Sequence, residues 1–153
     1  MEQEPLITWR RKPAGVDLAG LEEFAGVLLK RVARGREFHC RITNDTEMAS
    51  LNEQFRGKAG TTDVLSFPWN DVSPDGGERL GDIAISLQKA RAQAREFGHA
   101  VEEEIRILLL HGVLHLTGYD HESDDGEMRR AEQRWRKKLG LATGLIARAG
   151  EWK

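Results

Sequence analysis

Three histidines in the second half of the chain have the spacing of metal ligands. His111, His115 and His121 all lie in the segment HGVLHLTGYDH. Residues four apart stack on one face of a helix, so the first two imidazoles can reach one ion at about 2.0–2.1 Å. Gly118 can adopt the left-handed conformation that ends a helix, which lets the chain turn back and bring His121 to the same point. The spacing therefore predicts one zinc ion per chain on three histidines.

The predicted ligand set leaves one coordination position open. Three imidazoles fill three corners of a tetrahedral zinc ion, and water takes the fourth, as in catalytic rather than structural sites. Such a site suits hydrolysis, because zinc lowers the pKa of its bound water to about 7. A lone histidine on an apolar helix is usually a satisfied core residue, but burying two imidazoles without partners is costly. His39 and His99 have no ligand spacing to other residues.

The residue after the first histidine argues against one class of hydrolase. The same spacing occurs in metzincin proteases, where that residue is a catalytic glutamate. Here it is Gly112, which cannot move a proton. Glu104 shares the helical stripe of His111 but lies about two turns away, too far to replace that glutamate. A metal-dependent peptidase or amidase stays an alternative that lacks its general base.

The elements that must position these histidines alternate between helix and strand patterns. The turn-rich residues 69–79 (WNDVSPDGGER) are expected to form a surface loop between two strands. Together the patterns predict an α+β layer fold, a small sheet flanked by about five helices. Strands are expected at residues 6–9, 37–43, 63–67 and 80–86, and helices at about 17–34, 47–55, 87–97, 101–116 and from about 124. The strand at 37–43 alternates, with Phe38, Cys40 and Ile42 on one side and His39 and Arg41 on the other, and Ser86 can cap the helix expected at 87–97.

The helix expected to carry His111 and His115 is apolar nearly all round from Ile105 onward, which predicts a buried core helix. Asp124 and Glu127 have capping-box spacing at the start of the last helix. That helix is expected to bury the stripe Met128, Ala131, Trp135 and Leu139, and to expose Arg129, Arg130, Arg134, Arg136, Lys137 and Lys138.

Length and composition limit the class of protein. The chain has 153 residues, 39% hydrophobic and 31% charged, which suits one globular domain over residues 1–153. The net charge of −2 provides no overall basic field for nucleic acid. A single cysteine, Cys40, excludes an internal disulfide and favours the cytosol. No apolar run is long enough to cross a bilayer, and the acidic N-terminus lacks a signal-peptide core. We therefore expect a cytoplasmic protein without a membrane partner.

Three segments together resemble the signatures of the YbeY family, bacterial zinc-dependent endoribonucleases that mature ribosomal RNA. The order and spacing of all three match, and the resemblance spans nearly the whole chain. It implies an α+β fold with a small mixed four-stranded sheet, a metalloprotease-like zinc site on His111, His115 and His121, and Arg56 as a catalytic residue. The segments are FRGKAGTTDVLSFP (residues 55–68), LGDIAIS (80–86) and HGVLHLTGYDH (111–121).

The resemblance also implies a function. It points to an enzyme that cuts single-stranded regions of ribosomal RNA, in 3′-end maturation of the small-subunit RNA and in ribosome quality control. RNA and the ribosome or its proteins are the implied partners, and DNA is not expected. The second alternative is a non-catalytic ribosome-assembly factor in which zinc mainly holds the fold and the basic last helix does the binding. The attacking nucleophile and the general base stay open.

Several polar residues beside the three segments have two interpretations. The planar guanidinium of Arg56 has paired N–H donors that match two phosphate oxygens. From the sequence alone, Arg56 could equally be an exposed loop cation without a ligand. Asp63 and Asp82 stand in strands, where each can orient a ligand histidine or cap a turn. Asp120, next to His121, fits a turn or a supporting residue better than a general base. If the substrate is RNA, the cations of the last helix are natural phosphate contacts.

Overall fold

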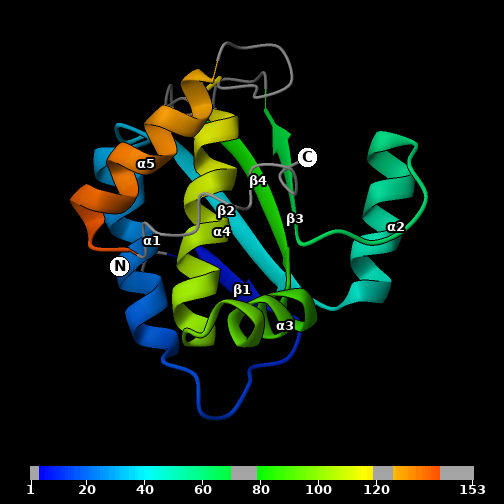
Figure 1. Ribbon diagram of the computed structural model, residues 1–153. Coiled ribbons are helices and arrows are strands. Elements are labelled where there is room, and N and C mark those ends of the chain that lie inside the picture. Colours follow the sequence, from blue (N-terminus) through cyan, green and yellow to red (C-terminus); the bar gives the residue numbers. More distant parts are fainter. Residues whose placement is uncertain (1–3, 70–78, 119–125, 142–153) are drawn as a thin grey trace.

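The protein is described from a computed structural model, which covers residues 4–69, 79–118 and 126–141. These residues form four strands and five helices, as predicted (Figure 1). In chain order they are β1 (Ile7–Trp9), α1 (Leu18–Arg31), β2 (Glu37–Thr43), α2 (Asp45–Arg56), β3 (Val64–Pro68), β4 (Arg79–Ser86), α3 (Leu87–Phe97), α4 (Val101–Leu116) and α5 (Glu127–Leu139). None of the described helices is both long and apolar enough to cross a membrane.

The four strands form one mixed sheet in the order β1-β2-β4-β3. Strands β1, β2 and β4 run parallel, and β3 lies antiparallel to β4 at the edge. Along β2 the residues Phe38, Cys40 and Ile42 are buried against the main core, while His39 and Arg41 point to the other face. The predicted alternation and the predicted mixed α+β fold are therefore confirmed.

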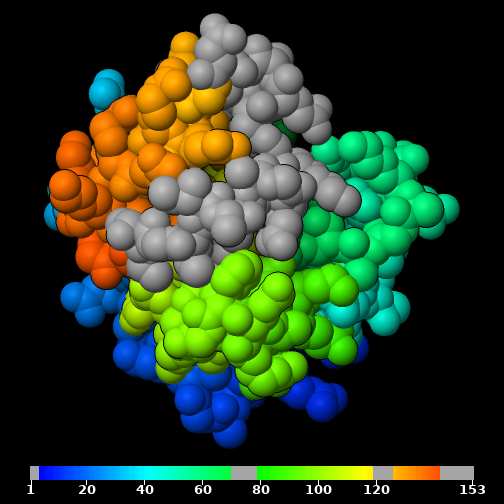
Figure 2. Space-filling view, in the orientation of Figure 1, coloured from blue at the N-terminus to red at the C-terminus, as the bar shows by residue number. Residues whose placement is uncertain are grey.

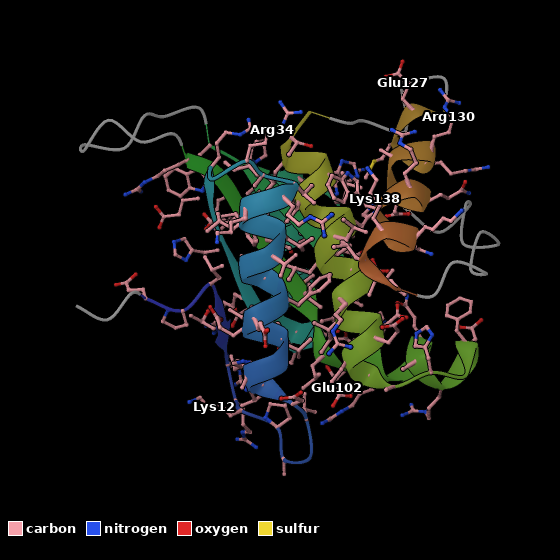
Figure 3. All side chains as sticks on the ribbon, turned by 90° about the vertical axis from the view of Figure 1, so that its left-hand side faces the viewer. Lys12, Arg34, Glu102, Glu127, Arg130 and Lys138 are labelled. Carbon is pink, nitrogen blue, oxygen red and sulfur yellow. The ribbon has the colours of Figure 1, made fainter. Side chains whose placement is uncertain are left out.

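Helices cover both faces of this sheet. On one face α4 crosses β3 and β4, with α1 and α5 packed beside it (Figures 1 and 3). On the other face a smaller core joins Met48 of α2 to Leu65 of β3 and Ala84 of β4. Strand β3 runs antiparallel to β4, so β3 ends at the end of the sheet where β4 begins. The C-terminal ends of α2 and α4 lie at this same end (Figure 1).

Local sequence explains where most helices begin and end. The Ser86 hydroxyl accepts a hydrogen bond from the Lys89 amide at 3.0 Å, so Ser86 caps α3 as predicted. Asn44 caps α2 in the same way, which starts that helix at Asp45, two residues earlier than expected. At the end of α1, Arg34 has φ of 55°, so the helix ends at Arg31 rather than extending to about residue 34.

The last helix differs from its prediction in what it buries. It begins at Glu127, with Gly126 at the cap position, and the expected capping residue Asp124 lies outside the described residues. Arg136, expected on the solvent side, is buried, and Trp135, expected in the buried stripe, is half-buried. The buried face consists of Met128, Ala131, Glu132 and Arg136, so α5 is rotated relative to the stripe inferred from apolar residues alone.

Candidate metal centre

The last two turns of α4 bring His111 and His115 together. Their ring centroids lie 4.8 Å apart at an interplanar angle of 76°, and His111 is only 3% exposed. The Nε2 atoms of both rings are shielded from solvent. His121 lies outside the described residues, and the residues that are described hold no cluster of three metal-ligating side chains. Two of the three predicted ligands are thus adjacent, and the third stays a prediction.

A carboxylate that the sequence reasoning missed supports the first of these histidines. The Nδ1 atom of His111 lies 2.8 Å from Oε1 of Glu132, which is 7% exposed on α5. The other oxygen of Glu132 accepts a hydrogen bond from Arg136 at 3.4 Å. A carboxylate on Nδ1 leaves Nε2 as the nitrogen that can face a metal, an arrangement common among metal-ligating histidines. The donor set of the described residues therefore fits zinc.

The turn of α4 that carries the histidines rests directly on the sheet. A Cβ placed on Gly112 would lie 3.0 Å from two carbon atoms of Ile83 on β4. The Ser66 hydroxyl on β3 also donates a hydrogen bond to the Gly112 carbonyl at 3.2 Å. A side chain at this position would have to push Ile83 away by a few tenths of an ångström, so the absence of the protease glutamate is accompanied by close packing of α4 on β4.

A second glycine allows the end of α4 to approach the sheet. Gly81 has φ of 155°, and a Cβ there would lie 2.4 Å from the Phe67 carbonyl and 2.7 Å from the side chain of Leu116. Gly81 also stands at a register shift between β2 and β4: Glu37 pairs with Arg79 but Phe38 pairs with Gly81, so one residue of β4 is skipped. The glycine of the LGDIAIS segment thus has a packing role.

Arg56 is the last residue of α2 and is exposed. Among the described residues, its side chain forms no hydrogen bond and no ion pair. The loop that follows is held to the helix, because the buried Asn52 amide donates to the Gly60 carbonyl at 3.1 Å. Arg56 therefore stands on a fixed helix end with its guanidinium available to a ligand. The end of α2 and the end of α4 lie at the same end of the sheet, on its two opposite faces (Figure 1).

Asp63, which immediately precedes β3, and Asp82 of β4 contact other partners than the described histidines. Asp63 accepts a hydrogen bond from the Gln93 side chain of α3 at 3.1 Å. Asp82 accepts one from the indole of Trp69 at 2.5 Å, in a groove of about 660 Å³ between α2 and the sheet. Asp120, the third carboxylate considered, lies outside the described residues. The carboxylate that supports a described ligand is Glu132.

Comparisons with known proteins identify the family of this chain. A family model described as endoribonuclease YbeY matches residues 16–140. A relative named endoribonuclease YbeY, from Solibacter usitatus, is 57% identical over 142 residues, which cover 93% of this chain and 92% of the relative. Another from Koribacter versatilis is 44% identical and covers 94% and 91%. The chain belongs to the YbeY family. The resemblance inferred from its three segments is thereby confirmed.

A solved structure of similar fold covers most of the chain. The solution structure of TM1509 from Thermotoga maritima aligns with a TM-score of 0.58 and 29% sequence identity, over 87% of this chain and 88% of that one. The prediction of an enzyme of the endoribonuclease class is confirmed by YbeY membership. YbeY proteins are metal-dependent endoribonucleases, so membership does not favour the peptidase alternative.

Proposed function

We propose that residues 1–153 act as a single cytoplasmic domain that cuts single-stranded regions of ribosomal RNA during small-subunit 3′-end maturation and quality control. One zinc ion per chain is held by His111, His115 and His121, and Arg56 binds phosphate. The observation that carries the proposal is the pair of imidazoles on α4, one of them supported by Glu132, in a chain of the YbeY family. RNA is the substrate, and the ribosome or its proteins are partners.

The described residues account for several requirements of phosphodiester cleavage. When bound, zinc supplies a positive charge that polarises a phosphoryl oxygen and lowers the pKa of its bound water. Arg56 supplies two parallel N–H donors that match two phosphate oxygens. Glu132 orients the His111 ring, and the α4–β4 packing at Gly112 fixes the helix turn from which both imidazoles project. The chain thus contributes charge and fixed geometry.

A basic surface formed by α1 and α5 supports RNA as the substrate. The half-buried Trp135 ring has Lys138 Nζ at 5.0 Å and Arg31 Cζ at 5.6 Å from its centroid. Arg34 is exposed just beyond the end of α1 and Arg134 is exposed on α5, and Figure 3 shows Arg34 and Lys138 on this side of the molecule. A chain of net charge −2 therefore still presents clustered cations to a phosphate backbone.

The nuclease proposal is tested with wild type, Arg56→Ala and His115→Ala. Wild type should contain about one zinc per chain and cut unstructured RNA. Arg56→Ala should keep its zinc and lose cleavage, whereas His115→Ala should lose both. Cleavage that survived both substitutions would identify a contaminating nuclease and contradict the proposal. Full complementation in cells by Arg56→Ala, with loss of fold on zinc removal, would instead favour the assembly factor.

The contribution of the basic surface is measured by salt dependence. Each phosphate contact to single-stranded RNA contributes about 0.7 to the slope of log affinity against log salt. The double variant Arg134→Gln/Lys138→Gln should therefore bind more weakly, with a slope lower by about 1.4. Arg91→Gln/Arg95→Gln removes the same charge from exposed positions of α3 and should change the slope little. Equal effects of both pairs would refute a specific contact at α5.

A further inference from the structure

Two carboxylate–imidazole pairs, each with a buried carboxylate, stand near opposite ends of α4. At its start, His99 Nε2 lies 2.7 Å from Oε1 of Glu104, a fully buried side chain. Near its end, His111 Nδ1 lies 2.8 Å from Oε1 of Glu132 on α5. The two pairs share their chemistry, but only the second includes a predicted metal ligand. The His99–Glu104 pair can therefore contribute to stability alone, whereas the His111–Glu132 pair can also affect metal binding.

We infer that Glu132 is a positioning residue that, together with Arg136, sets the tautomer and the ring orientation of His111 for metal binding. The inference rests on the proposed function and deepens it. An ionised carboxylate can only accept hydrogen bonds, so the His111 Nδ1 must carry the hydrogen. The neutral ring then has its lone pair on Nε2, the form that a metal ligand requires.

Burial makes this contact specific. Glu132 is 7% and Arg136 is 3% exposed, and the guanidinium of Arg136 lies 3.4 Å from Oε2 of Glu132. A buried carboxylate is costly unless charge and hydrogen bonds compensate it. Arg136 supplies a compensating charge from the next turn of α5, and His111 supplies a hydrogen bond from α4. The three side chains therefore connect α5 to the metal-binding face of α4.

The substitution Glu132→Gln keeps the size of the side chain and a hydrogen-bond acceptor but removes the charge. Supporting residues of this kind typically contribute about 10–100-fold to metal affinity. We expect zinc affinity, measured by competition with a chromogenic chelator, to fall within that range in Glu132→Gln and further in Glu132→Ala. Arg136→Met should weaken zinc binding in the same direction, because it leaves the Glu132 charge without that compensation.

The matched control is Glu104→Gln, which removes the charge of the buried α4 carboxylate that contacts His99, a residue preceding the helix. Glu104→Gln should lower the unfolding midpoint of the metal-free protein without changing zinc affinity of the folded protein. A second control, Arg134→Met, removes an exposed cation of α5 and should change neither quantity. Equal losses of zinc affinity in Glu104→Gln and Glu132→Gln would show general destabilisation and overturn the inference.

A measurement on the metal-free protein separates this inference from the proposed function. Long-range ¹H–¹⁵N NMR spectra distinguish the two neutral forms of each histidine. His111 should carry its hydrogen on Nδ1 in wild type and in Glu132→Gln, and should shift toward the Nε2–H form in Glu132→Ala. An unchanged form in Glu132→Ala would overturn the inference even if zinc binds. Wild type that bound no zinc but showed Nδ1–H at His111 would instead refute the metal site and leave the contact intact.

Discussion

Adding one methyl group at Gly112 tests how tightly the ligand-bearing turn of α4 rests on the sheet. The new Cβ of Gly112→Ala would lie 3.0 Å from Cδ1 and Cγ2 of Ile83 and 3.2 Å from Cγ1. Ile83 is 1% exposed, so its side chain has little room to move away. Overpacking of this kind costs about 1–3 kcal/mol, and alanine regains about 1 kcal/mol of helix propensity over glycine. We expect a net loss of about 1 kcal/mol of unfolding free energy, with an upper bound of about 2 kcal/mol.

The measurement is urea unfolding of the metal-free protein, because bound metal would add its own stabilisation. A loss of 1 kcal/mol corresponds to about 2–4 °C in melting temperature for a chain of this size. Gly26→Ala is the matched control, since Gly26 lies within α1 and a Cβ there meets nothing within 4 Å. That variant should gain about 1 kcal/mol from helix propensity alone.

A double-mutant cycle identifies the contact responsible. Ile83→Ala alone should cost about 2–5 kcal/mol, and in that background Gly112→Ala should become neutral or stabilising by up to about 1 kcal/mol. Tight packing of Gly112 against Ile83 is refuted if Gly112→Ala stabilises the wild-type protein as much as Gly26→Ala does. It is also refuted if the effect of Gly112→Ala is the same with and without Ile83.

The remaining predictions concern other residues around the sheet. Gly81→Ala should cost about 3 kcal/mol or more in urea unfolding, because its Cβ would clash with the Phe67 carbonyl. Burial raises the pKa of the Cys40 thiol, so a thiol reagent at pH 8 should label Cys40 only as fast as the protein unfolds, and labelling at the rate of an exposed thiol would contradict this packing. Hydrogen bonds from Arg41 lower the pKa of Glu47 below its ordinary value of 4.5. The Arg41–Glu47 contact therefore stabilises the folded protein fully above pH 4.5, and this stabilisation is lost as the pH falls through the lowered pKa of Glu47. Arg41→Gln should have a free energy of unfolding lower than that of wild type by about 0.2–1 kcal/mol at pH 7, and equal to it at pH 2.

Regular patterns in the sequence were sufficient to predict much of the fold. The alternation of β2, the cap at Ser86 and the apolar helix α4 each depend on local preferences or on one-sided burial, which a sequence records directly. The error at Arg136 has a different origin. A single charged side chain favours solvent, whereas a Glu–Arg pair can be buried because each charge compensates the other. The signal was available, because Glu132 and Arg136 continue the i, i+4 row that begins at the buried Met128.

Contacts between residues far apart in the chain could not be inferred from the sequence in the same way. No spacing along the chain indicates that Glu132 meets His111, because the contact depends on how α5 packs across α4. Likewise, the steric reason for Gly112 appears only when Ile83 is placed beneath it. The absence of a glutamate is visible in the sequence, whereas the tight contact that any side chain at this position would make with Ile83 is visible only in the structure.

The two layers of helices limit where a substrate phosphate can meet both predicted groups. Arg56 ends a helix packed on one face of the sheet, and His111 and His115 project from a helix packed on the other. Both helix ends lie where β3 ends, and β3 is an edge strand (Figure 1). Figure 2 shows α2 and α5 on opposite sides of this face of the molecule. A phosphodiester in reach of both groups must therefore lie at that end of β3, because the interior of the sheet separates the two layers elsewhere. Single-stranded RNA can bend around such an edge more readily than a rigid duplex, which is consistent with the proposed preference for unpaired regions.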